Sequence, residues 1–181
     1  MAEAQALAER LLAEPLPRRW RHVQAVGRRA EQVSALLDVD GQALVAAAWL
    51  HDIGYAPEAV DSGFHPLDGA RLLRGMAVDE RVVCLVAHHS CAVVEADERG
   101  LSTELAEFPR EESPTADALW YCDMTTGPDG ERLAVAGRLD EIRKRYGPGH
   151  IVTRFVDRAE SQIMAAVRRT EDRLRLAGAA R

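Results

Sequence analysis

Histidine and aspartate side chains that could bind a metal ion recur along this chain of 181 residues. The clearest pair is His51-Asp52, which directly follows the apolar run from Ala46 to Leu50. Further positions that could supply ligands lie on both sides of this pair: His22, His65, the adjacent His88 and His89, and Asp123. Neutral imidazole and carboxylate are groups that divalent transition metals take from proteins. An adjacent His-Asp pair can share one metal ion or bridge two.

Two of these candidates are carboxylates in apolar surroundings. An isolated carboxylate is costly to bury unless it is paired or binds a metal. Asp52 follows a segment so apolar that it must be buried nearly all round, and Asp123 ends the apolar run Ala118 to Cys122. A helix C-terminus also disfavours negative charge. A bound cation would compensate both carboxylates, whereas a histidine on an apolar face, such as His22, is by itself more often an ordinary core residue.

Apolar residues recur at helical spacing along nearly the whole chain. We expect helices over residues 4–13, 17–37, 42–51, 65–73, 79–89, 115–123, 131–146 and 151–176. Proline, glycine and aspartate separate these segments. Valine, isoleucine and threonine do not gather into alternating runs, so no sheet is expected. The predicted fold class is all-α, a helical bundle with short to medium connections.

The length of the chain predicts a single domain over residues 1–181. The candidate ligands fall in a core of about residues 20–126, and C-terminal helices over 131–178 are expected to pack on it. Residues 55–64 are predicted to form a loop, and the charged segment 96–114 a mobile excursion that could contain one short helix. Ile163, Met164 and Val167 of the last helix could serve the core or a homodimer interface equally well.

Composition and charge indicate the expected cellular compartment and the expected classes of binding partner. The first five residues lack the features of a signal peptide, and no apolar run is long enough to span a membrane. The three cysteines, Cys84, Cys91 and Cys122, are expected to be buried, inert thiols. We therefore expect a cytoplasmic protein that binds no membrane. The net charge of −6 argues against nucleic acid as a partner and leaves a phosphorylated small molecule as the expected substrate.

The order His, His-Asp, His, His, Asp resembles the HD-domain superfamily of metal-dependent phosphohydrolases. His22, His51-Asp52 and Asp123 match its four defining positions. The runs Leu50 to Gly54 and His65 to Leu73 look like the corresponding blocks of HD-GYP-type and related members. No Gly-Tyr-Pro segment follows His89, because Ser90-Cys91-Ala92 stands there instead. This departure argues against a cyclic dinucleotide phosphodiesterase of the HD-GYP type.

The resemblance implies an HD-domain helical bundle with two metal ions. His22, His51 and Asp123 would hold the first ion and Asp52 would bridge both. His65 with either His88 or His89 would hold the second. Neighbours on a helix point about 100° apart, so only one of the adjacent pair should face the metals. We favour His88, which continues the inward stripe of the preceding helix, and expect His89 to reach the substrate or to donate a proton.

The expected cofactors are two divalent transition metals, drawn from Fe, Mn, Co, Ni and Zn, because a nitrogen-rich site disfavours Mg. A metal pair can generate a bridging hydroxide and stabilise a phosphoryl transition state. Asp52 and His89 are the expected catalytic residues. Four residues are expected to contact the substrate, although solvated helix faces or turn formation would explain each of them as well: Arg18, Arg19, Arg71 and Thr126.

Three functions are compatible with such a site. The first is a phosphohydrolase acting on a nucleotide or another small phosphate ester. The second, also implied by the resemblance, is a mixed-valent di-iron oxygenase that cleaves a C–C or C–P bond with O₂. The third is a binding module on a degenerate scaffold, which the sequence opposes because no expected ligand is missing. We rank hydrolysis first and oxygenation second.

Overall fold

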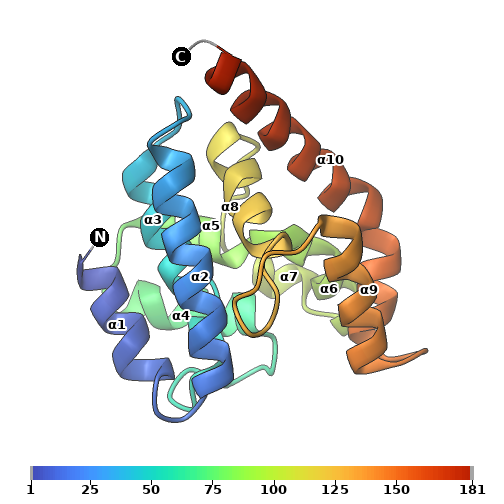
Figure 1. Cartoon of the computed structure of the whole chain (residues 1–181). Helices are drawn as coiled ribbons and strands as arrows, with labels where there is room; N and C mark the ends of the chain where they lie inside the picture. The colour runs from blue at the N-terminus through green and yellow to red at the C-terminus, as the bar shows by residue number, and fades with distance from the viewer. Residues whose placement is uncertain (1, 180–181) are drawn as a thin grey trace.

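The computed structural model describes residues 2–179. Within that range the named secondary-structure elements are all helices (Figure 1). The α-helices are α1 Ala2–Leu12, α2 Pro17–Ser34, α3 Gly41–Leu50, α4 His65–Gly75, α5 Glu80–Ala87, α6 Ala92–Arg99, α7 Ser102–Leu105, α8 Pro114–Met124, α9 Val135–Tyr146 and α10 Ile151–Ala179. Two short 3₁₀ turns, η1 Ile53–Tyr55 and η2 His89–Cys91, complete the list. The predicted all-α class is confirmed.

One predicted segment is wrong. Residues 96–114 are not an excursion, because the end of α6 and the short helix α7 fold there and the side chains of Ala96, Leu105 and Phe108 are buried in the core. Helix α7 is the short helix that the sequence prediction allowed for. The few apolar residues in this segment are too widely spaced to produce a helical pattern in the sequence. Tertiary packing, rather than local periodicity, orders the segment.

Helix α3 lies at the centre of the bundle. It contacts α1, α2, α5 and α8, which accounts for a sequence that is apolar on every side. Helix α2 packs closely on α3 because Gly27 leaves room for the indole of Trp49, where a β-carbon would clash. This contact brings His22 of α2 toward the end of α3 that carries His51.

A second close approach holds the turn after α3 against α4. A β-carbon on Gly54 would collide with the carbonyl oxygen of His65 and the backbone nitrogen of Gly69. The loop that connects these elements is tied down by the buried carboxylate of Asp68, which accepts hydrogen bonds from the backbone of Ser62 and Gly63. His65 is therefore fixed relative to His51 and Asp52 by backbone contact.

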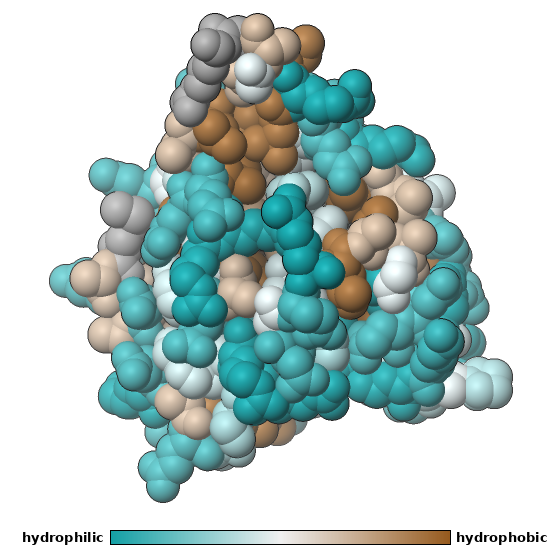
Figure 2. Space-filling view, in the orientation of Figure 1, coloured by the Kyte–Doolittle hydropathy of each residue, from teal (hydrophilic) through white to brown (hydrophobic). Residues whose placement is uncertain are grey.

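Helix α10 closes one side of the bundle, where it packs against α6, α8 and α9 (Figure 1). Ile163 and Val167 are fully buried and Met164 is partly buried, so the structure assigns this apolar stripe to the core of the chain. Figure 2 shows a largely hydrophilic face with a hydrophobic area near the C-terminal end of α10. Leu176, in the last turns of that helix, is 72% exposed. A homodimer stays a prediction.

The cysteines and the membrane prediction can be compared directly with the structure. Cys84, Cys91 and Cys122 are free and buried, as expected. Across residues 2–179, none of the helices combines the length and apolar character needed to traverse a lipid bilayer.

Candidate metal centre

Three side chains from three different helices meet in the first of two ligand groups. His22 comes from the middle of α2, His51 caps the C-terminus of α3, and Asp123 lies near the end of α8. His22 Nε2 lies 3.1 Å from Asp123 Oδ1 and 3.3 Å from His51 Nε2. All three residues are buried. We call them the first trio.

The second trio consists of Asp52, His65 and His89. Asp52 follows His51, His65 is the first residue of α4, and His89 begins the turn after α5. His65 Nε2 lies 3.1 Å from His89 Nε2 and 3.5 Å from Asp52 Oδ1. In each trio the potential ligand atoms lie within 4.8 Å of one another. Both trios are therefore compact enough for their ligand atoms to share a metal ion.

Asp52 connects the two trios. Its Oδ2 atom lies 3.4 Å from His51 Nε2 and 3.7 Å from His22 Nε2, whereas its Oδ1 atom faces His65. One carboxylate therefore directs an oxygen toward each trio. A bridging ligand between two ions requires this disposition.

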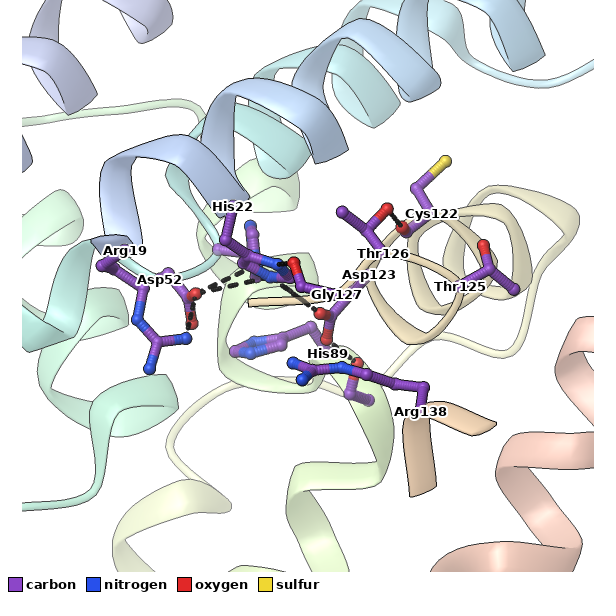
Figure 3. Close-up of polar contacts among 12 residues, drawn as sticks. Arg19, His22, Asp52, His89, Cys122, Asp123, Thr125, Thr126, Gly127 and Arg138 are labelled. Atoms are coloured by element: carbon purple, nitrogen blue, oxygen red, sulfur yellow. Dashed lines mark hydrogen bonds and ion pairs between the residues drawn. The ribbon is translucent and has the colours of Figure 1, made fainter. Parts of the chain in front are cut away.

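Backbone carbonyls fix the orientation and tautomer of three histidines. The Nδ1 atoms of His22, His51 and His89 lie 3.0, 2.8 and 2.6 Å from the carbonyl oxygens of Gly127, Ala48 and Val86. A carbonyl only accepts, so each Nδ1 carries the proton. In the neutral rings the lone pair is left on Nε2, the atom that faces the other ligands of each trio. Figure 3 shows His22 and His89 in this arrangement. This outer hydrogen bond is typical of metal-binding histidines.

The arrangement of these lone pairs shows that a cation fits the site. The Nε2 atoms of His22 and His51 lie 3.3 Å apart, and neither can donate to the other while both rings are neutral. Two buried acceptors that face each other are unfavourable unless a proton or a cation lies between them. The donor set, four imidazoles and two carboxylates, suits a divalent transition metal. The residues present therefore fit metal ions.

The electrostatics of the first trio also favour a positive charge between His22 and His51. Burial alone would lower the pKa of His51, but the adjacent Asp52 and nearby Asp123 outweigh it and raise that pKa to about 9. Burial opposes ionisation of the two carboxyl groups, yet Arg19 and the histidines hold the pKa of Asp52 well below its usual range. The histidines and Arg138 do the same for the pKa of Asp123. The carboxylates thus draw a proton onto His51 when no metal ion competes for it.

The second trio behaves differently. Burial lowers the pKa of His65 well below its usual value and also lowers the pKa of His89, where the neighbouring His51 adds to the effect. Both imidazoles therefore stay neutral near pH 7, which is the form that binds metal.

The choice of His88 over His89 as a ligand is wrong. His88 Nε2 lies 2.7 Å from the carbonyl oxygen of Phe108, and its Nδ1 is buried without a partner among the described residues. Helix α5 ends at Ala87, so His88 leaves the helical path with φ −113° and the inward stripe passes to His89. His89 lines the cavity, as an expected contact with the substrate requires, whereas the proton on its Nδ1 is held by the Val86 carbonyl.

A left-handed turn follows His89, and no pattern in the sequence predicts it. Ser90 and Cys91 have φ of 47° and 64°, a strained conformation for side-chain-bearing residues. The turn lets the Ser90 hydroxyl donate to Asp123 Oδ2, which leaves Oδ1 toward His22. Ser90 is therefore a positioning residue for the first trio.

Among the four residues expected to contact substrate, only Arg19 reaches the site. Its guanidinium donates to Asp52 Oδ2 over 2.7 Å and lies 4.1 Å from the ring centre of Tyr55. Tyr55 in turn stacks on His65 with ring centres 4.1 Å apart. Arg19 thus connects Tyr55 to the carboxylate that lies between the two trios.

The structure does not bring the other three to the metal ligands. Arg18 pairs with Asp129 on an exposed surface, and Arg71 pairs with Glu107. The hydroxyl of Thr126 is buried and donates to the carbonyl oxygen of Cys122, on the far side of the α8 terminus (Figure 3). These expectations are corrected, because spacing along the chain does not reveal which face of a helix end meets the cavity.

A cavity of about 180 Å³ opens beside the trios. Its wall includes Asp52, His65 and His89 from the site, together with Tyr55 and Glu95. Helices α9 and α10 and their connection supply the opposite wall, with the residues Arg138, Ile142, Arg145, Tyr146, His150, Val152 and Phe155. Sequence reasoning missed this wall, since no motif marks the C-terminal helices.

The fold and the site together define the class of this protein. It is a helical domain with two buried His/Asp groups that could hold metal ions, and Asp52 lies between them. The family model described as HD domain matches residues 19–123, more than half of the chain, so the chain belongs to the HD-domain family. The matched segment contains both trios. Comparisons with curated proteins and with solved structures gave no match. HD domains bind divalent metals and are generally metal-dependent hydrolases.

Proposed function

We propose that this protein is a phosphohydrolase that acts on a nucleotide or another small phosphate ester through a dinuclear metal site. The observation that carries the proposal is Asp52, with one oxygen toward each trio. Two divalent ions would supply positive charge for a phosphoryl transition state and would lower the pKa of a water molecule. Fe, Mn, Co, Ni and Zn suit the nitrogen-rich donor set.

The side chains around the trios would orient the substrate and the ligands. Arg19 shares the charge of Asp52 and borders the cavity, so it can hold a phosphate oxygen next to the trios. Ser90 keeps Asp123 turned toward His22. Tyr55 stacks on His65 and limits the rotation of that ring.

The leaving oxygen of a phosphate ester needs a proton, and the cavity wall contains a carboxyl group suited to provide it. Burial raises the pKa of Glu95, even though its ion pair with Arg99 acts in the opposite direction. Burial also raises the pKa of Tyr55 beyond its usual range, so the phenol holds its proton too tightly for this role. Glu95, which lines the cavity, is therefore the better placed of these two groups to donate a proton.

The experiment is a phosphate-release assay on protein loaded with each candidate metal. The panel contains monoesters, diesters and cyclic esters, including nucleotides. We expect release from at least one class, and loss of that release in Asp52→Asn, which removes one negative charge between the trios at nearly constant size. No release from any ester by fully loaded protein would refute the proposal.

A mixed-valent di-iron oxygenase that cleaves a C–C or C–P bond with O₂ is the second candidate. The observation that favours it is the donor set, in which four of six ligands are imidazoles, a composition that suits iron. Protein from iron-supplemented cells would then contain two irons with an EPR signal and consume O₂ only with substrate. Bound manganese, nickel or cobalt together with phosphate release would favour the hydrolase instead.

A further inference from the structure

Arg138 is a buried cation whose charge helps to lower the pKa of Asp123, but its hydrogen bond and ion pair go to Glu141 rather than to a metal ligand. It lies near the start of α9, outside the segment that matches the family model, and is 4% exposed. It borders the same cavity as Asp52, His65 and His89. Figure 3 shows its guanidinium directed toward Asp123 and His89, with no dashed contact to either.

The hydrogen-bonding capacity of Arg138 is largely unfilled. One terminal nitrogen donates to Glu141, whereas Nε is buried and has no partner among the described residues. A guanidinium has five N–H donors, accepts nothing and cannot lose its charge near neutral pH. Leaving such a donor buried and unpaired is costly. A buried arginine with a purely structural role would be expected to have its Nε satisfied.

Among the arginines that line the cavity, Arg138 is the one whose Nε is buried without a partner in the described residues. Glu141 is shared, since its other carboxylate oxygen lies 3.4 Å from Arg145 Nε. One carboxylate therefore faces two guanidinium groups. Arg19 and Arg99, which also line the cavity, each pair with a carboxylate of the same wall, Asp52 and Glu95 respectively.

We propose that Arg138 is the specificity residue that binds the phosphate group of the substrate, and that the substrate is a compact phosphate monoester. This inference rests on the proposed phosphohydrolase function. A guanidinium fork takes two oxygens of one phosphate. A monoester has three terminal oxygens, so one remains for the side of the cavity where the trios lie, whereas a diester has only two. A cavity of about 180 Å³ favours a small alcohol portion.

The first test measures binding of inorganic phosphate to metal-loaded protein by calorimetry, which needs no turnover. Arg138→Gln should weaken phosphate binding about 10- to 100-fold, the range expected for loss of a charge-assisted contact. Arg138→Lys keeps the charge but loses the fork, so its affinity should fall between those of Arg138→Gln and the wild type. The control is Arg143→Gln, which removes the same charge from α9 at a residue paired with Asp157 and Glu160, away from the cavity.

Metal content and the thermal midpoint are measured on every variant, and all should bind two ions. If Arg138→Gln does not fold, Arg138→Lys alone must still weaken phosphate binding about threefold or more. Unchanged phosphate affinity in a folded Arg138 variant, or an equal loss in Arg143→Gln, would overturn the inference.

A second measurement separates this inference from the proposed function. With an active ester, Arg138→Gln should raise the KM of monoesters and leave the KM of diesters unchanged. Phosphate binding that depends on Arg138, without hydrolysis of any ester, would refute the phosphohydrolase and keep the anion site. Hydrolysis of monoesters with a KM that does not depend on Arg138 would refute the inference alone.

Discussion

The Nε2 atoms of His22 and His51 lie 3.3 Å apart, and each ring is held in place through its Nδ1 by a backbone carbonyl. In a neutral ring, moving the proton from Nδ1 to Nε2 would break the hydrogen bond to the carbonyl. Both lone pairs therefore point to the same small volume beside Asp123. A cation in that volume relieves the repulsion, and this relationship underlies the first two predictions.

Removal of metal should destabilise the protein. A ligand that binds only the folded state stabilises it by about 4 kcal/mol at 1,000 times its dissociation constant. We expect chelation to lower the thermal midpoint by several degrees, and addition of Mn²⁺ or Fe²⁺ to restore it. Asp52→Asn should respond less to both treatments, and an identical midpoint in chelated and metal-loaded wild-type protein would contradict the prediction.

The metal-free protein should lose stability as the pH rises from 6.5 to 9. The carboxylates raise the pKa of His51 from 6.5 to about 9 against the effect of burial, so the folded state holds a proton that the unfolded state has lost. The stabilisation is complete below pH 6.5 and disappears through pH 9, with a size of up to about 3 kcal/mol. His65 and His89 have lowered pKa values and titrate below this window.

Urea unfolding of chelated protein at several pH values measures this loss. The decrease of the unfolding free energy with pH should be much smaller in His51→Gln, which has no proton to release at this position. It should also be much smaller in metal-saturated wild-type protein. A free energy of unfolding that stays constant from pH 6.5 to 9 in chelated wild-type protein would show that His51 is not protonated in the folded state.

The adjacent pair His88-His89 offers a matched comparison. His89→Gln removes a ligand atom that lies 3.1 Å from His65 Nε2 and should reduce the bound metal from two ions to one. His88→Gln alters a side chain that donates to Phe108 and should leave the metal content unchanged. Elemental analysis of both variants, purified in the same way, decides the assignment. The reverse pattern would restore His88 as the ligand.

Gly54 should tolerate no side chain. In Gly54→Ala the new β-carbon would collide with the His65 carbonyl and the Gly69 backbone, so α4 must shift. We expect a loss of about 1–3 kcal/mol, typical of overpacking, together with weaker binding of the second metal ion. Gly75→Ala is the control, because no atom lies within 4 Å of its added β-carbon, and it should be neutral or slightly stabilising. Equal stability of the two variants would mean that the turn does not fix His65.

The cysteines should be unreactive in the folded protein. Burial raises the pKa of Cys122 to about 12 and that of Cys91 to about 11, and it also raises the pKa of Cys84. Because the thiolate is the reactive form, a chromogenic disulfide reagent at pH 8 should react slowly with native protein and promptly with three thiols in denaturant. Rapid reaction of a native thiol would indicate local opening of the core.

The sequence by itself determined much of this protein. Helical periodicity predicted the all-α class and most helices, because a helix must turn an apolar face to the core wherever it lies. The ligand types, and the apolar runs that carry His51, Asp52 and Asp123, predicted the metal centre, since an unpaired buried carboxylate is too costly to occur without compensation. The resemblance to HD domains was also present in the sequence.

Only the tertiary structure decided the finer assignments. Helix α5 ends one residue before His88, and this local departure from helical geometry exchanged the roles of His88 and His89. Helix α9 lies across the cavity from the trios, so Arg138 meets a site whose ligands are all distant in the chain. Such contacts depend on how whole helices pack, and a single sequence contains no periodic signal for them.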